Sequence, residues 1–282
     1  MQECIELLKI APDGIFEVAG NRYSKSYLFS DVNYNTTSEE EQVRIFESYC
    51  KFLNAMDVEF KITINNKNRN MRSLREKVLF QKKGDGNDAE RGCYNQIMEK
   101  KIMEGKQGIE QERYLTVSIV RKNYEEAKAA FASLEAVLQK GFGELGSSLI
   151  TLNGVECLRV LHDFYRMGEE EYFSFDFEEA VRISRDYKDD ICNSMLKFYP
   201  TYMQDERRFA KALFIKKYPS SLSDRFLTEL ATVPAHTIIS IDVAPIPKDV
   251  TTSTLQKKYM GIESDMNLVI STIFTIQAHQ SC

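Results

Sequence analysis

The stretch SKSYLFSDVNYNTTSEEEQVRIFESYC, residues 24–50, contains the change from strand to helix on which the predicted fold depends. Tyr27 and Phe29 alternate with Leu28 and Ser30, which is the two-residue period of a β-strand. The alternation stops at Asn33-Tyr34-Asn35, and a helical pattern follows. Nothing in the stretch is typical of a catalytic motif, so we expect it to build the scaffold.

The helix after this break has a start signal and an apolar face of its own. Ser38 followed by Glu41 fits a capping box, in which each side chain bonds the backbone N–H of the other residue. Apolar residues recur at helical spacing and are expected to face the core. They are Val43, Phe46, Cys50, Leu53 and Ala55-Met56.

Strands and helices are also predicted on both sides of this stretch. Residues 14–18 and 23–32 are expected to form a hairpin around Gly20-Asn21. Residues 58–66 alternate apolar and polar side chains, which predicts a half-buried strand. Further predicted elements are a helix from Asn87 or Asp88 to Gly105, a strand over 114–120 and a helix over 124–140 that Gly141 ends.

The second half of the chain begins with a mostly helical section that is rich in aromatic residues. The predicted elements are this section over 154–203, a strand near 207–216, a helix over 223–230, a strand over 236–243 and a helix near 248–260. This order predicts an α+β fold with helices packed on mixed, largely antiparallel sheets and with ferredoxin-like βα units. We divide the chain into an N-terminal α+β subdomain (1–152), a mostly helical insertion (153–204) and a second α+β subdomain (205–282) that completes the sheet.

Composition narrows the class of protein. The 282 residues carry a formal net charge of −5, whereas a dedicated nucleic-acid binder is usually basic. The six cysteines form no CxxC pair, so we expect reduced thiols rather than a structural zinc site. The start of the chain does not fit a signal peptide, and the apolar stretch 268–276 is shorter than the ~20 residues that span a bilayer. We therefore expect a soluble protein that is not exported.

Motifs of nucleotide binding and catalysis give no clear match. No GxxxxGK[ST] loop occurs, and GFGELG (141–146) follows a predicted helix instead of a strand, so we interpret it as a helix end and turn. His162, His236 and His279 are widely separated and are expected to be structural or on the surface. Two runs of adjacent carboxylates, Glu169–Glu171 and Asp189-Asp190, are expected to be solvated. The sequence predicts no catalytic residue, cofactor or metal for this chain.

One concentration of charge is unusual for an acidic chain. Its basic residues are Lys61, Lys67, Arg69, Arg72, Arg75, Lys77, Lys82 and Lys83, against a single Glu76. Such a face is suited to an anionic lipid surface, a nucleic acid or an acidic partner. The alternative is a solvated rim, and the asparagines at 65, 66, 68 and 70 indicate a turn there. Seven of these residues, from Lys67 to Lys83, are the candidate partner-binding set.

Longer motifs in the chain resemble a known family. The Ser30–Tyr34 motif (SDVNY) after the first long strand, the Thr63–Asn66 motif (TINN) and residues 83–119, 218–230 and 239–250 carry the likeness. These segments resemble the amino-terminal region of conjugative-transfer ATPases of type IV secretion systems, the CagE/TrbE/VirB family, most closely those of Gram-positive integrative elements. The resemblance covers most of residues 13–260, although none of its motifs carries chemistry.

The resemblance implies a docking and assembly domain rather than an enzyme. In the family this region leads into a RecA-like motor with Walker A and B motifs, which would bind ATP and Mg²⁺. This sequence ends before those motifs, so we expect an excised domain or a truncated product without catalytic residues. The implied partners are inner-membrane channel components and further copies of the full-length protein. The implied location is cytoplasmic, at the inner face of the membrane.

Two other classes stay open at this stage. A stand-alone accessory protein would bind nucleic acid or an anionic surface through residues 61–83, with strong salt dependence. An enzyme would need a concave pocket with convergent polar groups and shifted pKa values. No feature of the sequence indicates such a pocket. If the chain is a docking domain, reversing Arg69, Arg72 and Arg75 to Glu is expected to weaken its association with a partner or membrane without unfolding the domain.

Overall fold

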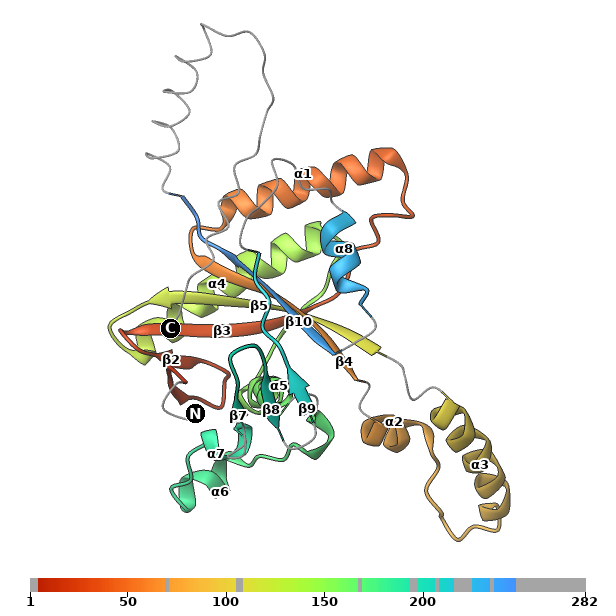
Figure 1. The fold of residues 1–282 in the computed structure, drawn as a ribbon. Helices are drawn as coiled ribbons and strands as arrows, with labels where there is room; N and C mark the ends of the chain where they lie inside the picture. The colour runs from red at the N-terminus through yellow and green to blue at the C-terminus, as the bar shows by residue number, and fades with distance from the viewer. Residues whose placement is uncertain are drawn as a thin grey trace, which may run out of the picture.

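The computed structural model describes residues 5–68, 71–104, 109–166, 169–192, 197–205, 208–215, 225–233 and 236–246 (Figure 1). Its main feature is a seven-stranded antiparallel sheet in the order β1-β2-β3-β5-β4-β10, with β6 also paired to β3. The strands are β1 (Leu7–Ile10), β2 (Phe16–Val18), β3 (Arg22–Phe29), β4 (Glu59–Asn68), β5 (Ile109–Val120), β6 (Leu149–Thr151) and β10 (Thr237–Val243). Together with the helices on this sheet, they confirm the predicted α+β class.

The centre of the sheet is a split βαβ unit. Helix α1 (Glu39–Ala55) connects β3 to β4, and helix α4 (Tyr124–Glu144) connects β5 to β6. The strands of this unit lie in the order β6-β3-β5-β4, so each strand that follows a helix is separated from the strand before it. Strands β1, β2 and β10 extend the sheet beyond the unit, and a ferredoxin-like arrangement stays a prediction for the chain as a whole.

The main core lies between the sheet and the helices α1 and α4, which cover one of its faces (Figure 1). Leu115 and Val117 of β5 point into it, while Tyr114, the residue before Leu115, belongs to the opposite face. Phe131 and Leu138 of α4 meet them and are fully buried. The alternation of β5 therefore supplies apolar side chains to two layers, as expected for a sheet covered on both sides.

Helix α1 is rotated relative to the prediction. Ser38 caps it by accepting the N–H of Glu41, but the Glu41 carboxylate pairs with Arg44, so only half of the predicted capping box forms. Val43 and Phe46, expected in the core, are each 58% exposed. Ile45 and Phe52, on the neighbouring side, pack there instead, whereas Leu53 and Met56 contact the core as predicted. The helix carries apolar residues on two sides, and spacing alone does not select between them.

Helix α4 also differs from its prediction. It continues to Glu144, so Gly141 lies inside it rather than ending it. A Cβ at Gly141 would lie 2.5 Å from Cδ2 of Phe52, which means that this glycine lets α1 and α4 approach closely. Gly146, two residues beyond Glu144, has a φ of +75° and terminates the helix. GFGELG is thus the last turn of a helix and its C-terminal cap.

The opposite face of the sheet is covered by the middle of the chain (Figure 1). Its elements are α5 (Gly154–Tyr165), the short 3-10 helix η2 (Glu170–Tyr172), α6 (Phe177–Arg182) and α7 (Lys188–Ile191). Asn153 and Glu156 form a complete capping box at the start of α5. A small three-stranded sheet follows, formed by β7 (Lys197–Phe198), β8 (Met203–Asp205) and β9 (Arg208–Ala210). The section predicted as mostly helical therefore ends in strands.

The elements near the two ends of the chain agree with the prediction where the structure describes them. The hairpin of β2 and β3 is confirmed, and Gly20 and Asn21 in its turn have φ of +76° and +57°, the left-handed region that glycine and asparagine favour. Helix α8 (Arg225–Ala231) precedes β10 as expected. The helix predicted near 248–260 lies outside the described residues. Strand β10 pairs with β4 in the main sheet, while the boundaries at 152 and 204 stay predictions.

Between β4 and β5 the chain forms a projecting arm. The two strands are paired as far as Asn68 and Ile109, and helices α2 (Met71–Val78) and α3 (Asp88–Glu104) follow between them. Helix α2 lies beside η2, and α3 stands further out from the body of the protein (Figure 1). We call residues 71–104 the arm.

Candidate functional site

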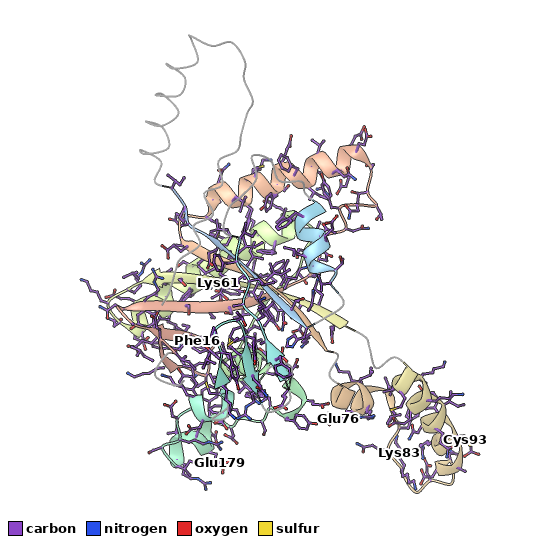
Figure 2. The ribbon with its side chains drawn as sticks, in the orientation of Figure 1. Phe16, Lys61, Glu76, Lys83, Cys93 and Glu179 are labelled. Atoms are coloured by element: carbon purple, nitrogen blue, oxygen red, sulfur yellow. The ribbon has the colours of Figure 1, made fainter. Side chains whose placement is uncertain are left out.

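The predicted basic residues do not share one surface. Lys61 lies on β4 in the body of the protein, whereas Lys83 lies on the arm (Figure 2). Lys61 is half exposed and its Nζ lies 3.3 Å from a carboxylate oxygen of Asp242 on β10. The stretch from 61 to 83 therefore divides into a part on the sheet and a part on the arm.

Lys67 must be removed from the partner-binding set as a surface cation. Its side chain is only 7% exposed, and its Nζ lies 2.8 Å from Glu112 and also bonds Glu170. Burial alone would lower the pKa of Lys67, but hydrogen bonds and charge from these two carboxylates outweigh it and raise the pKa. The correction extends to Glu170, predicted to be solvated, which is 11% exposed. Both charges belong to the interior.

The three arginines of the set differ in what the structure describes. Arg75 on α2 pairs with Glu99 on α3, with Nε 3.2 Å from Oε1. This ion pair joins the two helices of the arm. Reversing Arg75 to Glu would place two carboxylates together, so the predicted triple reversal would disturb the arm itself. Arg69 and the side chain of Arg72 lie outside the described residues.

Lys77, Lys82 and Lys83 are exposed on the arm, and no ion pair joins them to another described residue. The acidic residues of the adjoining turn are already neutralised: Arg91 pairs with both Asp85 and Asp88. The Asp88 carboxylate also accepts the backbone N–H of Lys83 and Gly84. These bonds hold the pKa values of Asp85 and Asp88 low. The three lysines therefore dominate the charge at this end of the arm.

Apolar side chains are exposed beside these lysines. Phe80 is 55% exposed, and its ring lies 4.9 Å from that of Tyr94 on α3. Asn95 fixes this contact by bonding both the N–H and the carbonyl oxygen of Phe80. Ile97, one turn further along α3, is 58% exposed. An ordered apolar surface with a basic rim has the composition of a protein interaction site.

A second feature, which the sequence did not predict, is a polar pocket around Lys67. Its lining includes Lys67, Glu112, Tyr114, Arg159, Asp163 and Glu170. Tyr114 donates its hydroxyl hydrogen to Glu112, and Asn65 Nδ2 donates to Asp163 Oδ2 at 3.2 Å. His236 Nε2 lies 3.4 Å from the same oxygen, close enough for an electrostatic contact but without the geometry of a hydrogen bond. The pocket thus gathers polar groups from β4, β5, α5 and η2, and His236, the residue before β10, lies beside it.

Several groups in and beside this pocket have shifted pKa values. Burial would raise the pKa of Asp163, but the contacts with His236, Asn65 and Lys67 outweigh it and lower the pKa. His162, buried on α5, shows the opposite balance: burial and the nearby Arg166 lower its pKa to about 4, although Asp163 opposes them. His162 is therefore neutral near pH 7.

The partners inside the pocket explain these charges without a ligand. Lys67 is shared by two carboxylates, and Asp163 is held by Asn65 and His236. Buried charges in this arrangement satisfy one another and join the sheet to the helices beneath it. The asparagines of β4, predicted to form a turn, are strand residues: Asn65 and Asn66 are 2% and 1% exposed.

Comparison of this chain with models of known protein families and with curated proteins finds no match. Within the part of the chain that the structure describes, no cluster of three or more His, Cys, Asp or Glu side chains is arranged to hold a metal ion. In the same residues, no helix combines the length and the apolar character that crossing a membrane requires.

Proposed function

We propose that this chain is the docking and assembly domain of a conjugative-transfer ATPase of the type IV secretion class. It is non-catalytic, and it positions the motor at the inner face of the membrane channel. ATP and Mg²⁺ belong to the motor in this proposal, and the partner is a cytoplasmic surface of the channel. The resemblance of residues 13–260 to that family is the basis of the assignment.

The observation that supports a docking role best is the composition and placement of the arm. It projects from the sheet, carries exposed Lys77, Lys82 and Lys83, and presents Phe80 and Ile97 beside them. Its internal contacts, Arg75 with Glu99 and Phe80 with Tyr94, fix its shape before any partner binds. Such preorganisation lowers the entropic cost of association.

The proposal is tested by co-sedimentation of the full chain with membranes from cells that express the transfer channel and from cells that lack it. The chain is expected to pellet only with the channel-containing membranes. The variant K77E/K82E/K83E is expected to lose most of this binding, because it reverses the rim of the arm. The control K51E/K122E/K140E changes the net charge equally at exposed lysines on and beside α1 and α4. Equal binding by both variants would show that the arm is not the docking surface.

The accessory-protein alternative, which places nucleic acid or an anionic surface on residues 61–83, loses support from the geometry. Lys61 is paired on the sheet, Lys67 is buried and Arg75 is paired within the arm. Three exposed lysines are a small number for a strongly salt-dependent interaction, since each phosphate contact contributes about one unit to the slope. Binding of the channel-free chain to anionic vesicles, lost in K77E/K82E/K83E, would restore this alternative.

A further inference from the structure

The small sheet formed by β7, β8 and β9 has two faces of different composition. Lys197, Gln204 and Phe209 are aligned across its three strands, and Phe198, Met203 and Ala210 are aligned in the neighbouring row. Because side chains alternate along a strand, these rows lie on opposite faces. Tyr199 and Tyr202, which close the β7–β8 hairpin through a backbone hydrogen bond of 2.9 Å, belong to the face of Phe209.

Three aromatic rings line this face. Tyr199 and Tyr202 stack with 4.6 Å between their centroids and an angle of 19° between their planes. Phe209 continues the row at 5.8 Å from Tyr202. The exposed fractions of these residues are 42%, 37% and 67% in the same order. We call Tyr199, Tyr202 and Phe209 the aromatic row.

The charge around the aromatic row is positive. Lys197 lies in register with Gln204 and Phe209, and Lys211 follows Phe209 by two residues; both lysines are exposed. Asp205 and Arg208 are in register with each other on the opposite face, so they do not offset the charge of these two lysines on the face of the aromatic row.

We propose that this face binds single-stranded nucleic acid. Unpaired bases stack on the aromatic row, and Lys197 and Lys211 contact the phosphates. Stacking platforms of exposed rings on an antiparallel sheet, with cations along the edge, suit single strands because every base presents a π-face. A duplex keeps its bases stacked inside and offers the rings nothing comparable. This site is separate from the arm and does not depend on the proposed docking role.

The first experiment is fluorescence anisotropy with the full chain and a fluorescein-labelled 15-nucleotide oligo(dT), compared with a 15-base-pair duplex. The oligo(dT) is expected to bind at least ten-fold more tightly than the duplex, and its affinity is expected to fall as salt rises from 50 to 200 mM. Absence of oligo(dT) binding at 50 mM salt, or stronger binding to the duplex, would overturn the proposal.

Matched variants locate the binding face. F209L keeps apolar area but removes the π-face, so the affinity for oligo(dT) is expected to fall about five-fold or more. F198L makes the same change at a residue that is 64% exposed on the opposite face and is expected to leave the affinity unchanged. K197Q is expected to reduce the salt slope by about one phosphate contact.

Three results would overturn the assignment of the face. They are an unchanged affinity in F209L, equal losses in F209L and F198L, and loss in K77E/K82E/K83E alone, which would move the binding to the arm. Circular dichroism melting of each variant identifies any that has unfolded. If a variant has unfolded, Y202W is tested in its place. This substitution retains an aromatic ring and is expected to keep or increase the affinity for oligo(dT). A Y202W protein that folds but binds several-fold more weakly also contradicts stacking.

Discussion

At the scale of single residues, two lysines on one strand have opposite environments. Lys61 and Lys67 are six positions apart on β4 and therefore lie on the same face of it. Lys61 is 46% exposed beside Asp242, whereas Lys67 is 7% exposed between Glu112 and Glu170. Both lysines were predicted to lie on one basic surface. Their ion-pair partners come from distant parts of the chain, so the residues near them in sequence do not reveal this difference.

This pair provides a stability prediction. Lys67→Met is expected to lower the free energy of unfolding by about 3–5 kcal/mol, since it leaves two buried carboxylates without their cation. Lys61→Met removes an exposed ion pair and is expected to cost no more than about 1 kcal/mol. Urea denaturation of both variants measures the difference. Equal effects would mean that the Lys67 cluster does not hold the layers together.

His162 gives a prediction for pH. Its pKa is about 4 in the folded protein, below the ~6.5 of an unfolded histidine, so protonation favours the unfolded state. Its contribution is present above pH 6.5 and is lost as the pH falls toward 4. The free energy of unfolding is expected to drop by up to about 2 kcal/mol between pH 7 and pH 5.

The matched variant for this pH effect is His162→Gln. Without a titrating ring, its stability is expected to change less between pH 7 and pH 5 than that of the wild type. Asp163 does not interfere in this window, because its lowered pKa places its loss of stability below pH 4. An identical pH dependence in both proteins, measured by urea denaturation, would assign the effect to other groups.

At the scale of elements, periodicity in the sequence predicted the strands better than the helix faces. Strands β4, β5 and β10 were found near their observed positions because alternation is a local signal. Helix α1 was found, but the face with Val43 and Phe46 was chosen over the one with Ile45 and Phe52. The buried face of α1 is the one that packs against α4. The sequence of α1 alone does not show where α4 lies.

Two glycines in α4 test how closely the helices pack. Gly141→Ala places a Cβ 2.5 Å from the buried Phe52 ring and is expected to destabilise by about 1–3 kcal/mol. Gly143→Ala meets nothing within 4 Å and is expected to stabilise by about 0.5–1 kcal/mol, the usual gain of Ala over Gly inside a helix. Thermal unfolding should therefore shift in opposite directions. Two positive shifts would mean that α1 moves away from α4 at little cost.

At the scale of the whole molecule, the α+β class was predictable but the polar pocket was not. Lys67 and Glu170 are 103 positions apart, and Asn65 and Asp163 are 98 apart. No periodic or motif signal in one sequence connects such positions, because their proximity results from α5 and η2 covering the far face of the sheet. Strand β4 was predicted to be half-buried, but both of its faces are covered near its end.

The layered body and the projecting arm should differ in local stability. Strand β5 is paired on both sides by β3 and β4, and its side chains fill two cores. Helix α3 has few comparable neighbours, and its Tyr94 and Ile97 are exposed. Hydrogen exchange is therefore expected to be on the order of a hundred-fold faster in α3 than in β5. Helix α4, with Phe131 and Leu138 buried, is the helical control and should be protected like the sheet.

The dependence of this exchange on protein concentration connects the arm to assembly. If α3 exchanges as slowly as α4, its exposed apolar residues must be covered in solution, and the available partner is a second copy of the chain. Repeating hydrogen exchange mass spectrometry at ten-fold lower concentration distinguishes the cases, because a contact between copies loses occupancy on dilution. Fast exchange of α3 at both concentrations is the expected result, since the proposed docking role requires the surface of the arm to be exposed. Slow exchange that persists on dilution would contradict the arm as an open surface altogether.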